Sequence, residues 1–512
     1  MKNIFIVIIM SLFFASAFSQ DVVELKLPKS DKVVIKLMFK NGSVSDPSGK
    51  EGLTKLTAAL ITSGGTKDLT FSQVQAKIYP MAAYSTTTVD KEVSIFTFEV
   101  HKDFLNEFYG ILKGLILTPS FDQKDFDRVK SNQQNYVDQV IRSSSDEEYS
   151  KMLLEDFLFA GTKYQTMVSG KSESVKSITL DDVKEHYAKF FGKNRVMVGI
   201  AGNYSTDFRN QLLNDLRTLP DAAPYIETKQ LAAQTDGIDV QIIAKDAFGS
   251  AVFMGFPMDV TRSSDDFAAL MVANSYLGEH RKSYGVLYDK IRTTRSMNYG
   301  DYSYIEWYDN GGSNMLPPPG VPRLTNYFSM WIRPVQIAKQ LQQQYAELKD
   351  VKIGHAHFAI RLALREVDKL LKNGMSKNDF EATREFLRSY IKLYVQSPSS
   401  RLGYLMDSKY YGKTDYIDEL DKLLAKLKLE DVNKAVKKYW QINNMKITIV
   451  TDKSEADELA KSLKENTYSP MSYSNLVKAG LPKEVLAEDE EVANFKLNVK
   501  NVTIIKTEET FK

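Results

Sequence analysis

The side chains that could bind a metal ion or act as a nucleophile are few in this chain of 512 residues. It contains no cysteine and five histidines. The missing cysteines exclude disulfides, thiolate zinc sites and cysteine nucleophiles together. The histidines are His101, His186, His280, His355 and His357. A metal site built on imidazoles must therefore use these positions, none of which lies in the first hundred residues.

His355 and His357 form the one close histidine pair. Residues two apart on a helix point about 200° apart and cannot share a metal ion, whereas on a strand they could. The flanking residues 342–344 and 361–364 have helical patterns, so we favour a pair in a loop or at a helix start over a metal site. His186 lies in a predicted helix, where we expect it on the surface or half-buried.

Composition indicates an ordinary globular protein with balanced charge. The chain is 43% hydrophobic and 26% charged, which argues against disorder. With 67 basic and 65 acidic residues, no net field favours nucleic acid or an acidic membrane surface. The length predicts two to four domains.

Residues 1–19 have the order of a secretory signal: a basic start at Lys2, an apolar run over residues 4–17, and small residues ending at Ser19. Cleavage after Ala17 and cleavage after Ser19 fit equally well. The run is shorter than the ~20 apolar residues that span a bilayer, so we favour a cleaved signal over a membrane anchor. No later segment is apolar enough to span a membrane. We therefore expect a periplasmic or secreted protein.

The elements that must position any site are duplicated along the chain. Residues 180–202 align without a gap with residues 429–451, and each segment predicts a capped amphipathic helix, a polar break and a β-branched strand. Residues 125–130 likewise resemble 379–384. The repeat is far longer than the ~20–50 residues of a solenoid period. It predicts a duplicated domain in which helices pack on a sheet.

The predicted fold class is therefore α+β, with two homologous α/β-layered domains. After the signal at residues 1–19, we place the first domain at residues 20–218 and the second at residues 238–512. The intervening residues 219–237 contain Pro220, Pro224 and Gly237 and are predicted to form a linker.

One segment of the first domain has a recognisable frame. Residues 39–66 combine a strand end, Gly42 in a turn, Gly52–Leu53 before a helix and Gly65–Thr66 after it. This frame resembles the metal-helix region of the insulinase/pitrilysin family of zinc peptidases, which includes mitochondrial processing peptidase. Together with the duplication, the resemblance covers nearly the whole mature chain. It implies two domains that face each other across a chamber.

The zinc motif of that family is absent. The family places H-x-x-E-H on the helix, where two imidazoles bind zinc and the glutamate activates water. Anchored on Gly52–Leu53, these positions hold Lys55, Ala58 and Ala59; anchored one residue later, they hold Leu56, Ala59 and Leu60. The third ligand of the family, a glutamate on a later helix, falls at Asn135 or Tyr136. The resemblance therefore implies a chain that binds no zinc itself.

The second domain retains a motif of the family. Residues 275–304 resemble a region in which an arginine and a tyrosine seven positions later project across the chamber to bind the substrate backbone. They correspond to Arg292 and Tyr299, and Arg295 matches a common basic position. A guanidinium is a fixed fork of donors for a carbonyl or carboxylate, and a phenol adds a further donor. Alternatively, Arg292 caps a helix and Tyr299 packs in the core.

The resemblance implies a non-catalytic, substrate-binding subunit of an exported heterodimeric zinc peptidase. Arg292 and Tyr299 would serve the zinc site of a partner subunit from the same family, with a peptide as substrate. A stand-alone peptide-binding or scaffold protein is an alternative, and an autonomous zinc peptidase is a further one.

Two other segments invite interpretation. The aromatic residues 302–308 and the Pro-rich loop up to Gly320 predict either a flap that grips peptide or a strand with an irregular hairpin. The acidic residues 488–491 are predicted to form a solvated surface.

Overall fold

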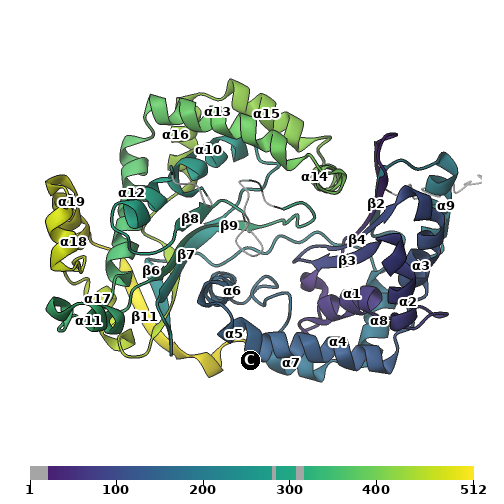
Figure 1. Cartoon of the computed structure of the whole chain (residues 1–512), viewed down its shortest axis with the longest axis horizontal. Coiled ribbons are helices and arrows are strands. Elements are labelled where there is room, and N and C mark those ends of the chain that lie inside the picture. Colours follow the sequence, from purple (N-terminus) through teal and green to yellow (C-terminus); the bar gives the residue numbers. More distant parts are fainter. Residues whose placement is uncertain (1–20, 280–283, 307–315, 317) are drawn as a thin grey trace, which may run out of the picture.

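The computed structural model describes residues 21–279, 284–306, 316 and 318–512, and it contains two mixed β-sheets (Figure 1). The first sheet has the order β1-β5-β2-β4-β3, and its β1 runs parallel to β5 while the other pairs are antiparallel. Its strands are β1 (Asp21–Lys26), β2 (Lys32–Phe39), β3 (Tyr84–Val89), β4 (Ser94–His101) and β5 (Val196–Gly202).

The second sheet repeats this order and adds one strand at an edge. Its order is β11-β6-β10-β7-β9-β8, with β6 parallel to both β10 and β11. Its strands are β6 (Ile238–Lys245), β7 (Ser250–Met258), β8 (Asp301–Tyr304), β9 (Asn326–Val335), β10 (Met445–Asp452) and β11 (Val499–Lys506). The five shared strands correspond one to one in order and direction. The predicted duplication and the predicted fold class are confirmed.

The repeated sequence segments form the same helix–strand unit in each half. Helix α8 (Leu180–Phe190) leads into β5, and α16 (Leu429–Tyr439) leads into β10. The Thr179 hydroxyl caps α8 by accepting from the backbone N–H of Asp182, as the capping pattern predicts. Buried Val183 and Val432 occupy matching positions on the two helices.

Helices cover the outer face of the first sheet. Apolar side chains of β2, β4 and β5 pack there against the helices in a single core cluster. Phe39, Phe96 and Phe191 meet edge-to-face in this core, with ring centroids between 5.2 and 6.0 Å apart. The helices of this half are α1 (Leu53–Ser63), α2 (Phe71–Ile78), α3 (Leu105–Leu117), α4 (Gln123–Asn135), α5 (Ile141–Ser143), α7 (Ser172–Ser177), α8 and α9 (Thr206–Leu216).

The second sheet is covered in the same way. Helix α10 (Phe267–Gly278) is buried almost all round, and the apolar stripe of α12 (Ala356–Asn373) packs beside it in the largest core cluster. The other helices of this half are α11 (Ala338–Gln344), α13 (Lys377–Tyr394), α15 (Tyr416–Lys426), α16, α17 (Ala456–Glu465), α18 (Asn475–Gly480) and α19 (Lys483–Ala493).

The remaining helical elements are short π-helical and 3₁₀ turns. Two of them are π-helical, η4 (Tyr136–Val140) and η5 (Tyr288–Thr293). The 3₁₀ turns are η1 (Ser43–Ser45), η2 (Tyr79–Met81), η3 (Lys102–Phe104), η7 (Ala346–Leu348) and η8 (Thr507–Glu509).

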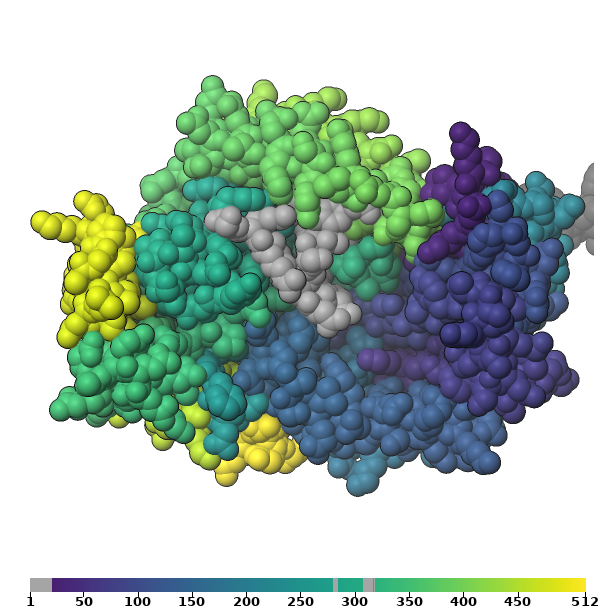
Figure 2. Space-filling model, in the orientation of Figure 1, coloured from purple at the N-terminus to yellow at the C-terminus, as the bar shows by residue number. Residues whose placement is uncertain are grey.

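Each half covers the inner sheet face of the other half with one helix. Helix α6 (Asp146–Leu158) packs on β7 and β10 of the second sheet, and α14 (Pro398–Tyr410) packs on β5, β1 and β2 of the first. Figure 1 shows both helices between the two sheets, and in Figure 2 the light-green surface around residue 400 abuts the purple first half. Gly199 allows the close approach of α14, because a Cβ at this position would lie 2.4 Å from the Met406 sulfur.

Buried ion pairs also join the halves. Arg323 of the second half binds Asp90 through two hydrogen bonds of 2.7 and 2.8 Å, and Glu155 of α6 through one of 2.7 Å. Lys91 pairs with the same Glu155 at 2.7 Å. These side chains are all at least 96% buried. Because an unpaired buried charge is costly, this network opposes separation of the two halves.

The predicted linker, residues 219–237, contains no helix or strand. Within the part of the chain that the structure describes, no helix combines the length and apolar character required to cross a membrane. The predicted signal, residues 1–19, lies outside that part.

Candidate functional site

Helix α1 carries the positions at which the family resemblance places a zinc motif. The helix begins at Leu53 because buried Asp46 caps it: the Asp46 carboxylate accepts from the backbone N–H groups of Gly52 (2.7 Å) and Thr54 (2.8 Å). The Thr54 hydroxyl donates to Asp46 at 2.6 Å and lies 2.9 Å from Nε2 of His186. Burial raises the pKa of Asp46 to about 7.

Lys55 of α1 and Tyr136 of η4 lie together in the structure. The Lys55 ammonium is 5.3 Å from the centroid of the Tyr136 ring and donates a 2.7 Å hydrogen bond to the Ser169 hydroxyl. Tyr136 is the first residue of a π-helical turn, a feature that often marks functional positions. The place to which α1 and the later segment formed by α4 and η4 would bring metal ligands thus holds an ammonium, a phenol ring and a hydroxyl.

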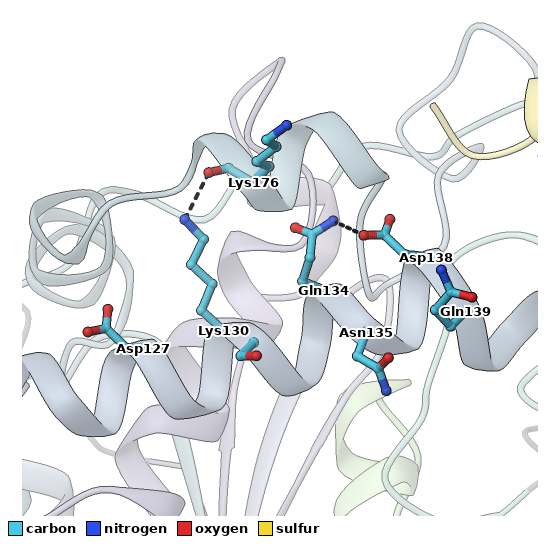
Figure 3. A pocket seen from close by; sticks show the side chains of 8 residues that line it. Asp127, Lys130, Gln134, Asn135, Asp138, Gln139 and Lys176 are labelled. Carbon is cyan, nitrogen blue, oxygen red and sulfur yellow. Dashed lines mark hydrogen bonds between the residues drawn. The ribbon is translucent and has the colours of Figure 1, made fainter.

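The neighbouring positions offer no metal ligand either. Ala58 is fully buried in the core of the first half, and half-buried Ala59 packs against the apolar cluster beneath α1. Asn135, the other position considered for a third ligand, is exposed and lines a shallow pocket with Asp127 and Lys176 (Figure 3). Tyr136, rather than Asn135, therefore faces α1.

The histidines do not form a metal site within the described residues, where no group of three or more potential ligands occurs. His355 and His357 lie at the start of α12, as favoured from the sequence, and both are buried. His280 lies outside the described residues. The expectation of an exposed or half-buried His186 is wrong: it is 3% exposed because it packs beneath α1, and burial lowers its pKa to about 3.

Arg292 and Tyr299 are in direct contact. The guanidinium carbon of Arg292 lies 4.8 Å from the centroid of the Tyr299 ring and 5.0 Å from that of Tyr288, whose hydroxyl accepts from Arg292. Tyr299 is 71% exposed and Arg292 is half-buried. The alternative in which Tyr299 packs in the core is therefore wrong. Arg292, like Tyr136, belongs to a π-helical turn, η5.

Arg295 has a different role from Arg292. Its side chain is fully buried and binds Asp489 at 2.7 Å and Glu488 at 2.9 Å. Lys290, Arg365 and Lys369 also pair with Glu488, each at 3.1 Å. The expectation that the acidic run 488–491 is merely solvated is thus wrong for its first two residues, which attach α19 to η5 and α12.

Three further residues of the site could not be predicted from the sequence. Ser169 meets Lys55 from a loop distant in the chain, and its partner could not be inferred from spacing. Arg333 of β9 stacks on Tyr299 with a distance of 5.6 Å to the ring centroid, and it pairs with Glu147 of α6 at 2.8 Å. Strand pairing of β8 with β9 brings Arg333 to Tyr299, which the alternation of residues along a single strand cannot reveal.

Comparison with known proteins agrees with this architecture. The family model for the insulinase family, peptidase family M16, matches residues 21–170, and the model for the peptidase M16 inactive domain matches residues 177–387. A Helicobacter pylori protein named non-peptidase homolog YmxG is 25% identical over 431 residues, 82% of this chain and 89% of that protein. A Bacillus subtilis protein named uncharacterized zinc protease YmxG is 20% identical over 347 residues, 67% and 75% of the two chains.

Solved structures show the same fold. The crystal structure of a peptidase M16 inactive domain from Pseudomonas fluorescens has a TM-score of 0.72 at 16% identity, covering 85% of this chain and 96% of that one. A chain of complex III2 from Candida albicans has a TM-score of 0.64 at 14% identity, covering 84% and 93%. With family matches in both halves and Lys55, Ala58 and Ala59 on α1, the chain belongs to the insulinase family, peptidase family M16, as a non-catalytic homologue that lacks the zinc motif.

Proposed function

We propose that this chain is an exported, peptide-binding subunit that serves a zinc-bearing partner subunit of the same family. The observation that carries the proposal is a contrast between the two halves. The helix that bears zinc in the family presents Lys55, hydrogen-bonded to Ser169, whereas the second half presents Arg292 and Tyr299 in contact and accessible. A chain with a substrate-binding pair and no group of metal ligands among its described residues would require another subunit for hydrolysis.

The first half also offers an edge at which an extended peptide could bind. Strand β3 pairs with β4 alone within the described residues and lies beside α1, on the side that faces the second half in Figure 1. Tyr84, Thr86 and Thr88 are exposed along it. A free strand edge supplies main-chain donors and acceptors that recognise peptide of varied sequence. This edge supports peptide binding as the retained activity.

The test is to purify the full mature chain from its native host together with whatever binds it, and to measure metal content and peptide cleavage. We expect less than stoichiometric zinc and no cleavage for the chain alone, and cleavage when a zinc-bearing relative is added. Arg292→Ala should then lower the rate of the pair, whereas Arg217→Ala on the outer surface should not.

Each other outcome identifies a different function. Peptide binding without any zinc-bearing partner would favour a stand-alone peptide-binding or scaffold protein. One zinc ion per chain, with cleavage that a chelator abolishes, would overturn the proposal in favour of an autonomous peptidase.

A further inference from the structure

Four side chains of the second half form an alternating stack of rings and guanidinium groups. In order they are Tyr288, Arg292, Tyr299 and Arg333, with separations between guanidinium carbon and ring centroid of 5.0, 4.8 and 5.6 Å. Cation–π contacts of this length hold planar guanidinium groups over aromatic faces and leave their N–H edges directed sideways. The stack therefore positions both guanidinium groups before any ligand arrives.

The two guanidinium groups differ in how their charge is balanced. Arg333 pairs with Glu147 of α6 at 2.8 Å. Arg292 has no carboxylate within ion-pair distance among the described residues, and its hydrogen-bond partner is the neutral hydroxyl of Tyr288. On the same turn, Lys290 is already paired with Glu488. Among the described residues, the stack thus presents one guanidinium group without a carboxylate partner beside an exposed phenol ring.

A nearby acid does not supply the missing negative charge. Asp301 opens β8 two residues after Tyr299 and is fully buried, and burial raises its pKa well above the ordinary value. One of its oxygens accepts from the amide of Asn298 at 2.7 Å, and the same amide donates to the backbone carbonyl of Arg333. Burial therefore favours the protonated form of Asp301, whose carboxyl group connects through Asn298 to the Arg333 backbone and makes no ion pair with Arg292.

We propose that this stack binds the C-terminal carboxylate of a peptide, with Arg292 as the primary fork and Arg333 as a second cation. The inference rests on the proposed peptide-binding function and names its ligand class: peptides with a free C-terminus. A carboxylate is planar and accepts two parallel N–H bonds from one guanidinium, a match that a single backbone carbonyl lacks. The part of the Tyr299 ring that stays exposed between the two guanidinium groups gives the terminal side chain an apolar surface to contact.

The experiment compares two forms of one ligand. A fluorescent pool of short peptides of mixed sequence is prepared once as free acids and once as C-terminal amides, and its binding to the full mature protein is measured by anisotropy. We expect the acids to bind roughly ten- to hundredfold more tightly, because only the free acid offers a charged acceptor for the hydrogen bonds of the guanidinium groups. Arg292→Gln should reduce the ratio of acid to amide affinity to near one, and Arg333→Gln should reduce it partly.

Arg217→Gln is the matched control, since Arg217 at the end of α9 also donates to a neutral side chain, that of Asn214. It should leave the ratio unchanged. Equal affinity of acids and amides for the unmodified protein would overturn the carboxylate site while leaving peptide binding intact. Binding of neither form would overturn both this inference and the proposed function. Circular dichroism of each variant checks that the fold is retained, so that a lost ratio reports the site.

Discussion

The ammonium of Lys55 donates a 2.7 Å hydrogen bond to the hydroxyl of Ser169 while lying 5.3 Å from the centroid of the Tyr136 ring. In the zinc peptidases that the chain resembles, helices in this arrangement bring imidazole and carboxylate ligands to a metal ion. Here the same geometry brings together groups that bind one another. The difference between this chain and a metal enzyme thus lies in side chains, since the fold that would position the ligands is intact.

Restoring the catalytic glutamate of the motif should destabilise the protein. Ala58 is fully buried, so Ala58→Glu would place a carboxylate in the core of the first half without a cationic partner. We expect a loss of several kcal/mol in the free energy of unfolding at pH 7, and a smaller loss at pH 5, where the new acid is protonated. Urea unfolding at the two pH values measures this. Ala59→His, at a half-buried position, should cost far less, and equal losses would contradict the placement of Ala58.

Because of Glu92, the free energy of unfolding should fall as the pH rises. Burial raises the pKa of Glu92 to about 7 from its ordinary 4.5, so the folded state holds a proton that the unfolded state releases. The stabilisation is complete below about 4.5 and lost as the pH rises to about 7. Glu92→Gln removes this dependence and should gain up to ~3 kcal/mol over the unmodified protein between pH 4 and pH 8. If the difference in the free energy of unfolding between the two proteins were the same at every pH in this range, the prediction would be contradicted.

Glu488 should be the main attachment of the C-terminal helix α19. Hydrogen bonds from Arg295, Lys290 and Lys369 hold its pKa well below the usual range, so its contribution is present above about pH 4.5 and disappears as the pH falls below that value. Glu488→Gln leaves buried Arg295 with one carboxylate, and we expect a loss of about 2–3 kcal/mol near pH 7 after allowing for the partial exposure of the lysines. Thermal unfolding measures it. Glu490→Gln is the control and should change stability by no more than ~0.5 kcal/mol.

Substitutions at Gly199 and Met406 should have coupled effects on the free energy of unfolding. A Cβ at Gly199 would lie 2.4 Å from the Met406 sulfur and 3.2 Å from a methyl carbon of Leu402, so Gly199→Ala pushes α14 away from the first sheet. We expect a loss of about 1–3 kcal/mol. Met406→Ala alone leaves a cavity and costs about 2–5 kcal/mol. The double variant should lose less than the sum of the two, and strict additivity would show that the helix does not rest on this glycine.

The sequence predicted the duplication of the fold. The aligned helix–strand units ending at Gly202 and Asp452 revealed the duplication, because both copies must bury the same apolar face. The missing zinc ligands followed from residue types alone. Periodicity could not show that His186 is buried, because the element that covers it is α1, which lies far away in the sequence. Nor could it reveal the pairing of Arg333 with Glu147, which depends on how the two halves are docked.

The segment that predicts a flap or an irregular hairpin was resolved in part. Residues 301–304 form strand β8, paired with β9, whereas residues 307–315 and 317 lie outside the described residues. The acidic residues 488–491 differ from the sequence expectation for a general reason. A cluster of carboxylates in a sequence predicts a solvated surface unless its cationic partners are known. Here the partners are Lys290, Arg295, Arg365 and Lys369, which lie far from the cluster in the sequence.

The reciprocal placement of α6 and α14 has a consequence for the integrity of the molecule. Because each half lends a helix to its neighbour, a protease that cuts the chain between Leu219 and Gly237 severs one peptide connection and leaves both interlocked surfaces in place. The two fragments would migrate as one particle under native conditions and separate only in denaturant. Either fragment produced alone would expose an uncovered sheet face, so we expect neither fragment to be soluble without the other.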